Sequence, residues 1–513
     1  MINYDIIIIG TGAGGGTLAY SLAATGKKIL ILERGDYIPK EKENWDTEAV
    51  FIKGKYKTKE TWYDKDNKTF HPGIHYCVGG NTKVYGAALL RMREEDFNEL
   101  KHHGGTSPEW PISYDDLEPY YTQAEHMYHV HGKHGIDPCS PPVSEDYTLA
   151  SLPHESRIEE LKTDMEKLGL KPFPLPIGVK FNDAKKGESP TVLDRFDGFP
   201  DPSESKADSH VVCIKEALKY DNVTLVTNAK VTKLLTCKNG QRVTKVEVEQ
   251  FGKARSFSGD LIIVACGAIN SAVLLLNSKN NNHPNGLANS SDLVGRNYMA
   301  HNNSALLAIS KKPNPTIFGK TLGLNDFYFG DDDFQFPMGH IQMLGKSDAV
   351  MFKADAPKLA PGMALEYIAK HALDFWMTSE DLPDPENRVL VDDMGNITLK
   401  YKENNLEGHN RLQKKLKWIL ENVGCETHVL PNNMYLGKKI PIAGTAHQCG
   451  TLRFGNNPKT SVLDTYCKAH DLENLYVVDG SFFPSSSAVN PALTIIAQAL
   501  RVGEHLKKNV LAI

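Results

Sequence analysis

The chain has 513 residues, of which 41% are hydrophobic and 24% charged, as in ordinary soluble globular proteins. No apolar run approaches the length of about 18 residues that a membrane span needs, and a net charge of −5 gives no support for a nucleic-acid partner. Eight cysteines without a CxxC pair predict free thiols in a reducing compartment, and no N-terminal export pattern is present, so we expect a cytoplasmic protein.

The first 35 residues predict a βαβ unit. The continuous apolar runs Ile6–Ile9 and 28–33 are typical of buried parallel strands, and a helical segment closed by a glycine lies between them. The turn after the first strand has the GxGxxG pattern, which lets the backbone approach a pyrophosphate at a helix N-terminus. An acid 23 positions after Gly10 is placed to accept hydrogen bonds from a ribose diol. The unit therefore predicts dinucleotide binding, through Gly10, Gly12, Ala13, Gly14, Gly15 and Glu33.

The next stretch is polar, and its lysines at 53, 55, 57 and 59 alternate. Alternation predicts an edge strand with all four lysines on one face; a ladder of charge that steers an anionic substrate is the alternative. A second glycine-rich turn follows at 78–86. The histidines at 126, 129, 131 and 134 have the density of a metal site, but zinc usually draws on two separated ligand pairs. We expect a solvated helix end there and no metal, with a metal site left open.

Farther along the chain, amphipathic patterns predict helices at 155–168, 209–220 and 409–423. Strands are predicted at 223–226, 243–248 and 261–264, and the last of these runs into Gly267. Near the C-terminus a strand at 475–478 leads through a Gly/Ser-rich turn to a helix from Pro491 to about Lys507. Proline at the first helical position, with Ser487 or Asn490 as the cap, is the usual start of such a helix.

Five blocks in this order resemble the glucose–methanol–choline (GMC) flavoprotein oxidoreductases. They are Gly10–Gly15 with Glu33, the segment Gly79–Gly86, the strand and turn 262–271, the VGRN segment 292–297 followed by His301, and His447-Gln-Cys-Gly-Thr with 478–491. The resemblance covers nearly the whole chain. It implies an α/β fold in which a doubly wound FAD-binding domain joins a substrate domain built on an antiparallel sheet plus helices. The segments expected for the FAD domain are 1–100, 190–300 and 441–513. We expect covering and connecting segments at 101–189 and a substrate-binding domain at 301–440.

The same resemblance implies FAD-dependent oxidation of an alcohol, CH–OH to C=O. His447 would take the hydroxyl proton, Asn490 would hold the alkoxide, and hydride would pass to flavin N5. Imidazole suits a base because its pKa lies near working pH. From position alone, His447 is equally well a histidine satisfied within a turn, and Asn490 a helix cap. Beyond Gly10–Gly15 and Glu33, the residues expected to bind FAD are Gly79, Gly80, Thr82, Val84, Gly267, Asp479, Asn490 and Pro491.

Two departures from the family pattern bear on these expectations. Phe454 stands where the family usually has methionine, which we interpret as a packing change. Val84 stands where relatives with covalent FAD have histidine, so we expect non-covalent FAD; His71 and His75 leave another linkage open.

A sugar, glycoside or polyol is the favoured substrate, whereas the electron acceptor is open. A non-redox flavin-bound lyase and a catalytically silent flavoprotein subunit are the alternative functions.

Overall fold

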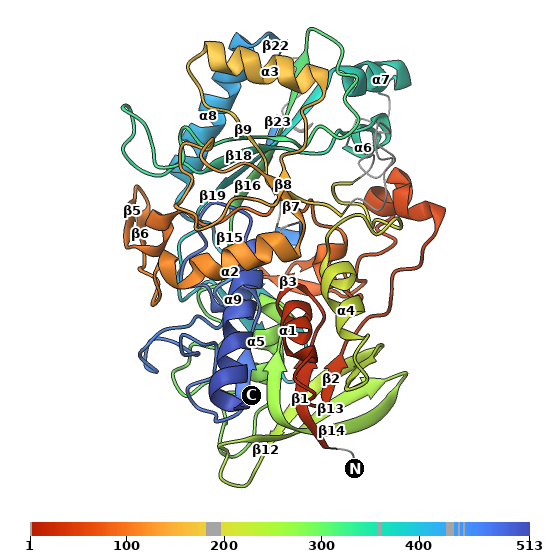
Figure 1. Ribbon diagram of the computed structural model, residues 1–513, viewed down its shortest axis with the longest axis vertical. Helices are drawn as coiled ribbons and strands as arrows, with labels where there is room; N and C mark the ends of the chain where they lie inside the picture. Colours follow the sequence, from red (N-terminus) through yellow and green to blue (C-terminus); the bar gives the residue numbers. More distant parts are fainter. Residues whose placement is uncertain are drawn as a thin grey trace.

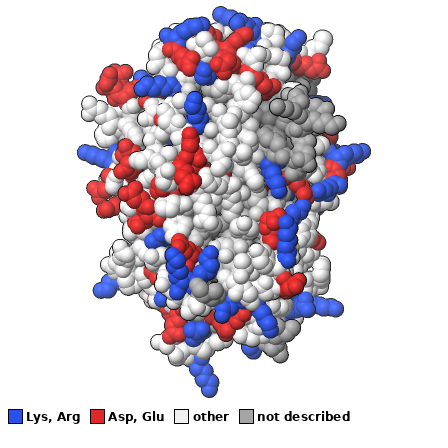
Figure 2. Space-filling model, viewed as in Figure 1, with Lys and Arg blue, Asp and Glu red and all other residues white. Residues whose placement is uncertain are grey.

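The computed structural model describes residues 3–180, 196–355, 361–426, 436–439, 442–444 and 447–512. Positions 190 and 441, where two of the expected FAD-domain segments begin, lie outside this part of the chain. Figure 1 shows two units stacked along the long axis, with both chain termini in the lower unit. On the face in Figure 2, acidic and basic side chains are intermingled. No helix in the described ranges combines the length and apolar character of a membrane span.

A parallel sheet forms the centre of the lower unit. Its order is β11-β2-β1-β14, and β25 extends it beyond β14. The strands are β1 (Asn3–Ile9), β2 (Ile29–Leu32), β11 (Val223–Val226), β14 (Lys253–Val264) and β25 (Leu475–Val477). β12 (Ala229–Thr236) and β13 (Val243–Gln250) continue antiparallel from the first half of β14. Chain order reverses between β1 and β14, and a doubly wound sheet binds its ligand at that point.

Helices cover this sheet and join it to the rest of the molecule. α1 (Ala13–Ala23) packs against α9 (Ala492–His505), which packs in turn on α2 (Tyr114–Met127), and the three lie side by side in Figure 1. α5 (Ala268–Asn277) follows β14. The βαβ unit and the strands predicted at 223–226, 243–248, 261–264 and 475–478 are confirmed, and so are α9 and α8 (Leu406–Asn422) near their predicted limits.

The upper unit is built on an antiparallel sheet of order β22-β16-β19-β18-β17-β9, with β23 also paired to β16. Its strands are β9 (Phe173–Pro174), β16 (Asn302–Ser310), β17 (Leu322–Leu324), β18 (His340–Met343), β19 (Ala372–Ser379), β22 (Cys425–Glu426) and β23 (Leu436–Lys439). Alternation along these strands directs Leu306, Ile341 and Phe375 into a core beneath α8 and α3 (Ser156–Lys167). On the opposite face, Leu307 and Ile309 pack into a second apolar cluster, whereas Asn303, His340 and Gln342 form a polar area. The doubly wound fold with a second, antiparallel unit is as expected.

A smaller sheet joins two segments that are far apart in the sequence. β3 (Trp62–Asp64) pairs with β4 (Thr69–Phe70) and with β21 (Ile397–Lys400), which pairs with β20 (Arg388–Val391). Val389 and Leu399 are buried in the same core as β1 and β14. Residues 388–400 therefore pack on the lower unit.

The remaining elements are short. They are β5 (Leu100–His102), β6 (Gly105–Ser107), β7 (Val130–Gly132), β8 (Leu149–Ala150), β10 (Ile177–Gly178), β15 (Met299–Ala300), β24 (Gln448–Cys449), α4 (Lys215–Ala217), α6 (Ala349–Asp355) and α7 (Gly362–His371).

One local prediction is wrong. Residues 53–59 form no strand: a π-helical turn at Glu48–Ile52 precedes them, and Lys53 and Lys55 pair with Glu48 and Glu41. Two of the alternating lysines are therefore held by local ion pairs and do not lie on one face of a sheet. The helix expected at 209–220 is present but shorter: a π-helical turn at His210–Ile214 runs into α4, which ends at Ala217.

Candidate active site

The glycine turn after β1 is packed tightly on one side and open on the other. A Cβ on Gly14 would lie 1.9 Å from the carbonyl oxygen of Val478, and one on Gly15 would lie 2.2 Å from that of Gly10. A Cβ on Gly12 would meet no atom within 4 Å, and the same holds for Gly267 after β14. The close contact at Gly14 holds α1 against Val478, the residue that follows β25. The open positions at Gly12 and Gly267 leave space beside the backbone at the carboxyl ends of β1 and β14, and we call this space the crevice.

Glu33 lies at the end of β2 and is 6% exposed. Its Oε2 accepts hydrogen bonds from the backbone N–H of Thr11 (3.1 Å) and from its hydroxyl (2.6 Å), and Oε1 accepts one from the N–H of Gly35 (2.9 Å). Burial raises the pKa of the Glu33 carboxyl, although these hydrogen bonds act in the opposite direction. The carboxylate is thus fixed beside the first glycine turn and retains acceptor capacity on Oε1.

The second glycine segment packs directly on the first. The N–H of Gly79 donates to the hydroxyl of Thr11 (2.9 Å), and a Cβ on Gly80 would lie 3.1 Å from the Cα of Gly12. Both glycines have positive φ, at +97° and +56°. Thr82 lies in the 3₁₀ turn Gly80–Lys83, where its hydroxyl donates to the carbonyl of Gly79 and accepts from the N–H of Ser209.

The other expected cofactor residues come from three segments of the chain. Val84 ends the 3₁₀ turn and is partly buried, Ala13 begins α1, and Gly267 precedes α5 with φ of +84°. The buried carboxylate of Asp479 accepts from the N–H groups of Gly267 (2.9 Å) and Ser481 (2.9 Å). Burial raises its pKa. The crevice is therefore bordered by segments from both ends of the chain.

His447 and Asn490 are 43 residues apart in sequence and meet in space. His447 Nε2 lies 3.3 Å from Asn490 Nδ2, and His447 Nδ1 lies 2.9 Å from His301 Nδ1. The strand pairing explains the second contact, because Ala300 of β15 is opposite Gln448 of β24 in an antiparallel ladder. One step farther along that ladder brings the two histidines together.

The turn that carries His447 adjoins the crevice. A Cβ on Gly480 would lie 2.6 Å from the carbonyl oxygen of Gln448, and the N–H of Gly450 donates to the carbonyl of Gly480 at 3.2 Å. Gly480 follows Asp479, which accepts a hydrogen bond from Gly267, so the turn that carries His447 packs beside a segment that borders the crevice.

Asn490 is not the cap of α9. Pro491 occupies the cap position instead, and no side chain caps the helix. The expected start with proline as the first helical residue is therefore wrong by one position, and the Asn490 side chain faces His447 instead of capping the helix. The Oδ1 atom of Asn490 is buried and has no partner among the described groups, and the same is true of the hydroxyls of Ser481 and Ser487. Unsatisfied buried polar atoms of this kind call for a ligand or ordered water.

Electrostatics keep His447 neutral. Burial is the main cause of a pKa well below the usual value of 6.5, and His301, Lys320 and His340 lower it further. Burial also lowers the pKa of His301. A neutral imidazole at working pH has a free lone pair and can accept a proton.

The polar face of the upper sheet lies over this region. The hydroxyl of Thr378 donates to the carbonyl of Ala488, two residues before Asn490. On the same face Trp376 Nε1 donates to Asn303 Oδ1 (3.1 Å), and Asn303 Nδ2 donates to the carbonyl of His301 (2.6 Å). His340 and Gln342 share this face, because they pair directly with Thr378 and Trp376.

The histidine cluster at 126–134 takes part in local contacts. His134 Nε2 lies 3.6 Å from the buried carboxylate of Glu125, and its ring stacks on Tyr147. Arg91 binds both oxygens of Glu125, at 2.8 and 2.6 Å. In the ranges that the structure describes, no three His, Cys, Asp or Glu side chains are placed to hold a metal ion.

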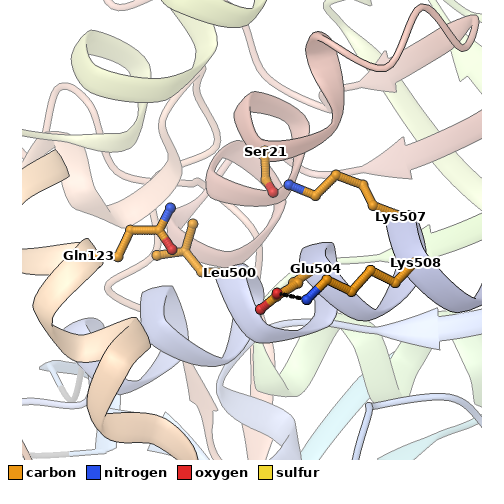
Figure 3. Close-up of a pocket in the computed structure, with 6 residues that line it drawn as sticks. All are labelled: Ser21, Gln123, Leu500, Glu504, Lys507 and Lys508. Atoms are coloured by element: carbon orange, nitrogen blue, oxygen red, sulfur yellow. Dashed lines mark hydrogen bonds and ion pairs between the residues drawn. The ribbon is translucent and has the colours of Figure 1, made fainter. Parts of the chain in front are cut away.

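A pocket at the surface lies far from His447. It opens between α1, α2 and the end of α9 (Figure 3). Its lining residues are Ser21, Gln123, Leu500, Glu504, Lys507 and Lys508. Asn490 precedes the opposite end of α9, which is about 20 Å long at 1.5 Å per residue. The pocket is therefore separate from the crevice.

Sequence reasoning missed the partners of the expected residues. Thr11 joins the two glycine segments, and His301 contacts His447. Lys320 lowers the pKa of His447, and it forms an ion pair with Asp197 at 2.7 Å. The sequence shows His301 as the histidine after the VGRN segment, but only the pairing of β15 with β24 shows that it contacts His447.

Sequence comparison identifies the family. Two family models described as GMC oxidoreductase match residues 4–303 and 383–499. The chain is 28% identical to 2-methyl-1,2-propanediol dehydrogenase of Mycolicibacterium austroafricanum, covering 98% of this chain and 95% of that protein. It is 26% identical to the fructose dehydrogenase large subunit of Gluconobacter japonicus, covering 98% of each.

The fold agrees with that of a solved structure. Pyridoxine 4-oxidase from Mesorbium loti superposes with a TM-score of 0.68 at 17% identity, over 99% of this chain and 100% of that one. With both family models matched in order along the sequence, the chain belongs to the FAD-binding GMC oxidoreductase family, whose members include oxidases and dehydrogenases of alcohols and sugars.

Proposed function

We propose that this protein oxidises an alcohol with His447 as the base and Asn490 as the hydrogen-bond partner of the substrate oxygen. The observation that carries the proposal is the 3.3 Å contact between His447 Nε2 and Asn490 Nδ2 beside the glycine-lined crevice. A substrate hydroxyl that contacts both groups from one side would lose its proton to Nε2 while the amide N–H binds the developing alkoxide. The lowered pKa of His447 supports this role, because the base is unprotonated at neutral pH.

FAD is the cofactor, held by the residues around the crevice. The open positions at Gly12 and Gly267 leave room for a pyrophosphate, and Glu33 is placed for the ribose diol. The unpaired hydroxyls of Ser481 and Ser487 fit a polar ligand in the same place. The proposed contact residues are those from Gly10 to Gly15, Glu33, Gly79, Gly80, Thr82, Val84, Gly267, Asp479, Asn490 and Pro491. When bound, FAD supplies the hydride acceptor for the reaction.

The flavin is attached without a covalent bond. At position 84 the side chain is valine, which has no nitrogen to bond to a flavin. We therefore expect acid precipitation of the purified protein to leave all the yellow colour in the supernatant. Colour that stays with the pellet, and leaves it in His75→Ala or His71→Ala, would contradict this and identify the linkage.

A sugar, glycoside or polyol is the proposed substrate. Two relatives support this, because their names specify 2-methyl-1,2-propanediol and fructose as the compounds they oxidise. The upper sheet supports it too, since the buried residues that pack over this region, Asn303, His340 and Gln342 among them, are polar rather than apolar. We assign substrate binding to residues 301–440 on this basis, apart from 388–400, which pack on the lower unit.

The protein acts in a reducing compartment, as its cysteines suggest. All eight are free thiols, and five of them are buried. Buried thiols away from oxidants need no disulfide partner. The electron acceptor is a small molecule or protein that reaches the flavin from solution.

An anaerobic titration tests the proposed reaction. Sugars, glycosides, polyols and simple alcohols are added in turn while the flavin absorbance near about 450 nm is followed. We expect bleaching by a compound from one of the first three classes, and readmission of air then separates oxidase from dehydrogenase. Flavin that no alcohol bleaches would overturn the proposal in favour of a lyase or a silent subunit.

A further inference from the structure

His301 is held by two contacts whose chemistry differs. Its Nε2 lies 3.0 Å from the carbonyl oxygen of Ser486, and its Nδ1 lies 2.9 Å from Nδ1 of His447. The residue is 3% exposed, and its ring packs edge-on against that of His447 at 4.9 Å. A ring enclosed in this way has little freedom to turn over.

The contact with Ser486 decides where the protons lie. A carbonyl oxygen only accepts hydrogen bonds, so Nε2 of His301 carries the proton. In a neutral imidazole the other nitrogen is then an acceptor, so His301 Nδ1 accepts from His447 Nδ1–H. His447 Nε2 is left unprotonated, and this atom is the one that faces Asn490.

We propose that His301 is a positioning residue that fixes the tautomer of His447, so that the basic lone pair points toward Asn490 and the substrate oxygen. The inference rests on the proposed function, in which His447 is the base. Without an acceptor at Nδ1, an Nδ1–H group of His447 would be a buried donor with no partner, so the proton shifts to Nε2. The form with Nε2–H cannot take a proton from substrate.

The surrounding charges do not replace this role. Lys320 and His340 lower the pKa of His447, and Glu380 raises the pKa of His301. Lys320 has only donors and is paired with Asp197. His340 is bound to Asn325 at 2.7 Å and fully buried. His301 is the group in hydrogen-bond contact with Nδ1 of His447 among the described residues.

Two nearly isosteric variants test the inference. Asn in His301→Asn keeps an oxygen acceptor close to the position of Nδ1, whereas Leu in His301→Leu has no acceptor. We expect His301→Leu to lower kcat about 100-fold or more with little change in KM, since a base in the wrong tautomer is inactive. His301→Asn should stay within about 10-fold of the wild type, because tautomer selection needs an acceptor and not a titrating group. Equal losses in both variants, or none in His301→Leu, would overturn the inference.

A spectroscopic measurement separates tautomer from folding. ¹⁵N-labelled histidine distinguishes protonated from unprotonated ring nitrogens, and the signals lost in His447→Ala assign this residue in the holoenzyme. We expect Nδ1–H in the wild type and a shift toward Nε2–H in His301→Leu. A wild-type His447 with Nε2–H would overturn the inference even if the leucine variant does not fold. Wild-type turnover in His447→Ala would instead overturn the proposed function itself.

Discussion

Replacing His447 by alanine lowers the rate of flavin reduction by the alcohol substrate by about 100- to 10,000-fold, the usual contribution of a general base. Asn490 stays in place to bind the substrate oxygen, but no group takes the hydroxyl proton. We expect flavin content and melting temperature to change little, because the crevice at Gly12 and Gly267 is formed by other segments. The measurement is anaerobic stopped-flow reduction, with the exposed His103→Ala as the matched control.

The pH dependence of the wild type follows from the same group. Burial and neighbouring charges hold the pKa of His447 well below 6.5. The active form is unprotonated, so kcat/KM stays level as pH falls to about 6.5 and declines only when pH falls through the lowered pKa. A decline that begins above pH 7 and disappears in His447→Ala would contradict the assignment, as would a variant that reduces its flavin at the wild-type rate.

The lower unit could be predicted from sequence because its signals are local. The apolar runs Ile6–Ile9 and Ile29–Leu32 and the glycines between them lie within one βαβ unit, and each element agrees with its neighbours. The strand predicted at 53–59 is wrong because its signal, an alternation of charge, has no support from neighbouring elements. Their alternation matches a strand, but Lys53 and Lys55 pair with acids on neighbouring turns and need no partner strand. A pattern of charge specifies register weakly when neither face is buried.

The site was only partly accessible from sequence. Family resemblance gave His447 and Asn490, and the structure brings them together, but their roles stay predictions. The contact between His301 and His447 depends on the pairing of β15 with β24, two strands of two residues each that have no pattern of their own. Asn490 shows the same limit: its position before a proline predicts a cap, whereas its tertiary neighbour determines where the side chain points.

Gly12 and Gly14, two residues apart, give the second large prediction, because they differ in what a methyl group would meet. In Gly14→Ala the added Cβ would lie 1.9 Å from the carbonyl oxygen of Val478, so α1 must move away from β25. We expect this variant to lose about 3 kcal/mol of stability or to be insoluble. In Gly12→Ala the methyl group meets no protein atom within 4 Å, and φ of −66° suits alanine. The fold should therefore be unaffected.

The effect of Gly12→Ala falls on the cofactor instead. If the pyrophosphate of FAD lies against this backbone, a methyl group there separates it from the N–H groups at the start of α1. Losing one or two such hydrogen bonds to a charged group weakens FAD binding about 10- to 100-fold. The measurements are the flavin-to-protein ratio and FAD affinity of both variants, with thermal unfolding after flavin removal. We expect Gly12→Ala to keep the wild-type melting temperature but lose flavin, and Gly14→Ala to have a lower melting temperature. This result would show that Gly12 makes room for the cofactor and that Gly14 holds the helix in place. A Gly12→Ala protein that binds FAD as tightly as the wild type would place the pyrophosphate elsewhere, because the added methyl group meets no protein atom and can act only on a bound ligand.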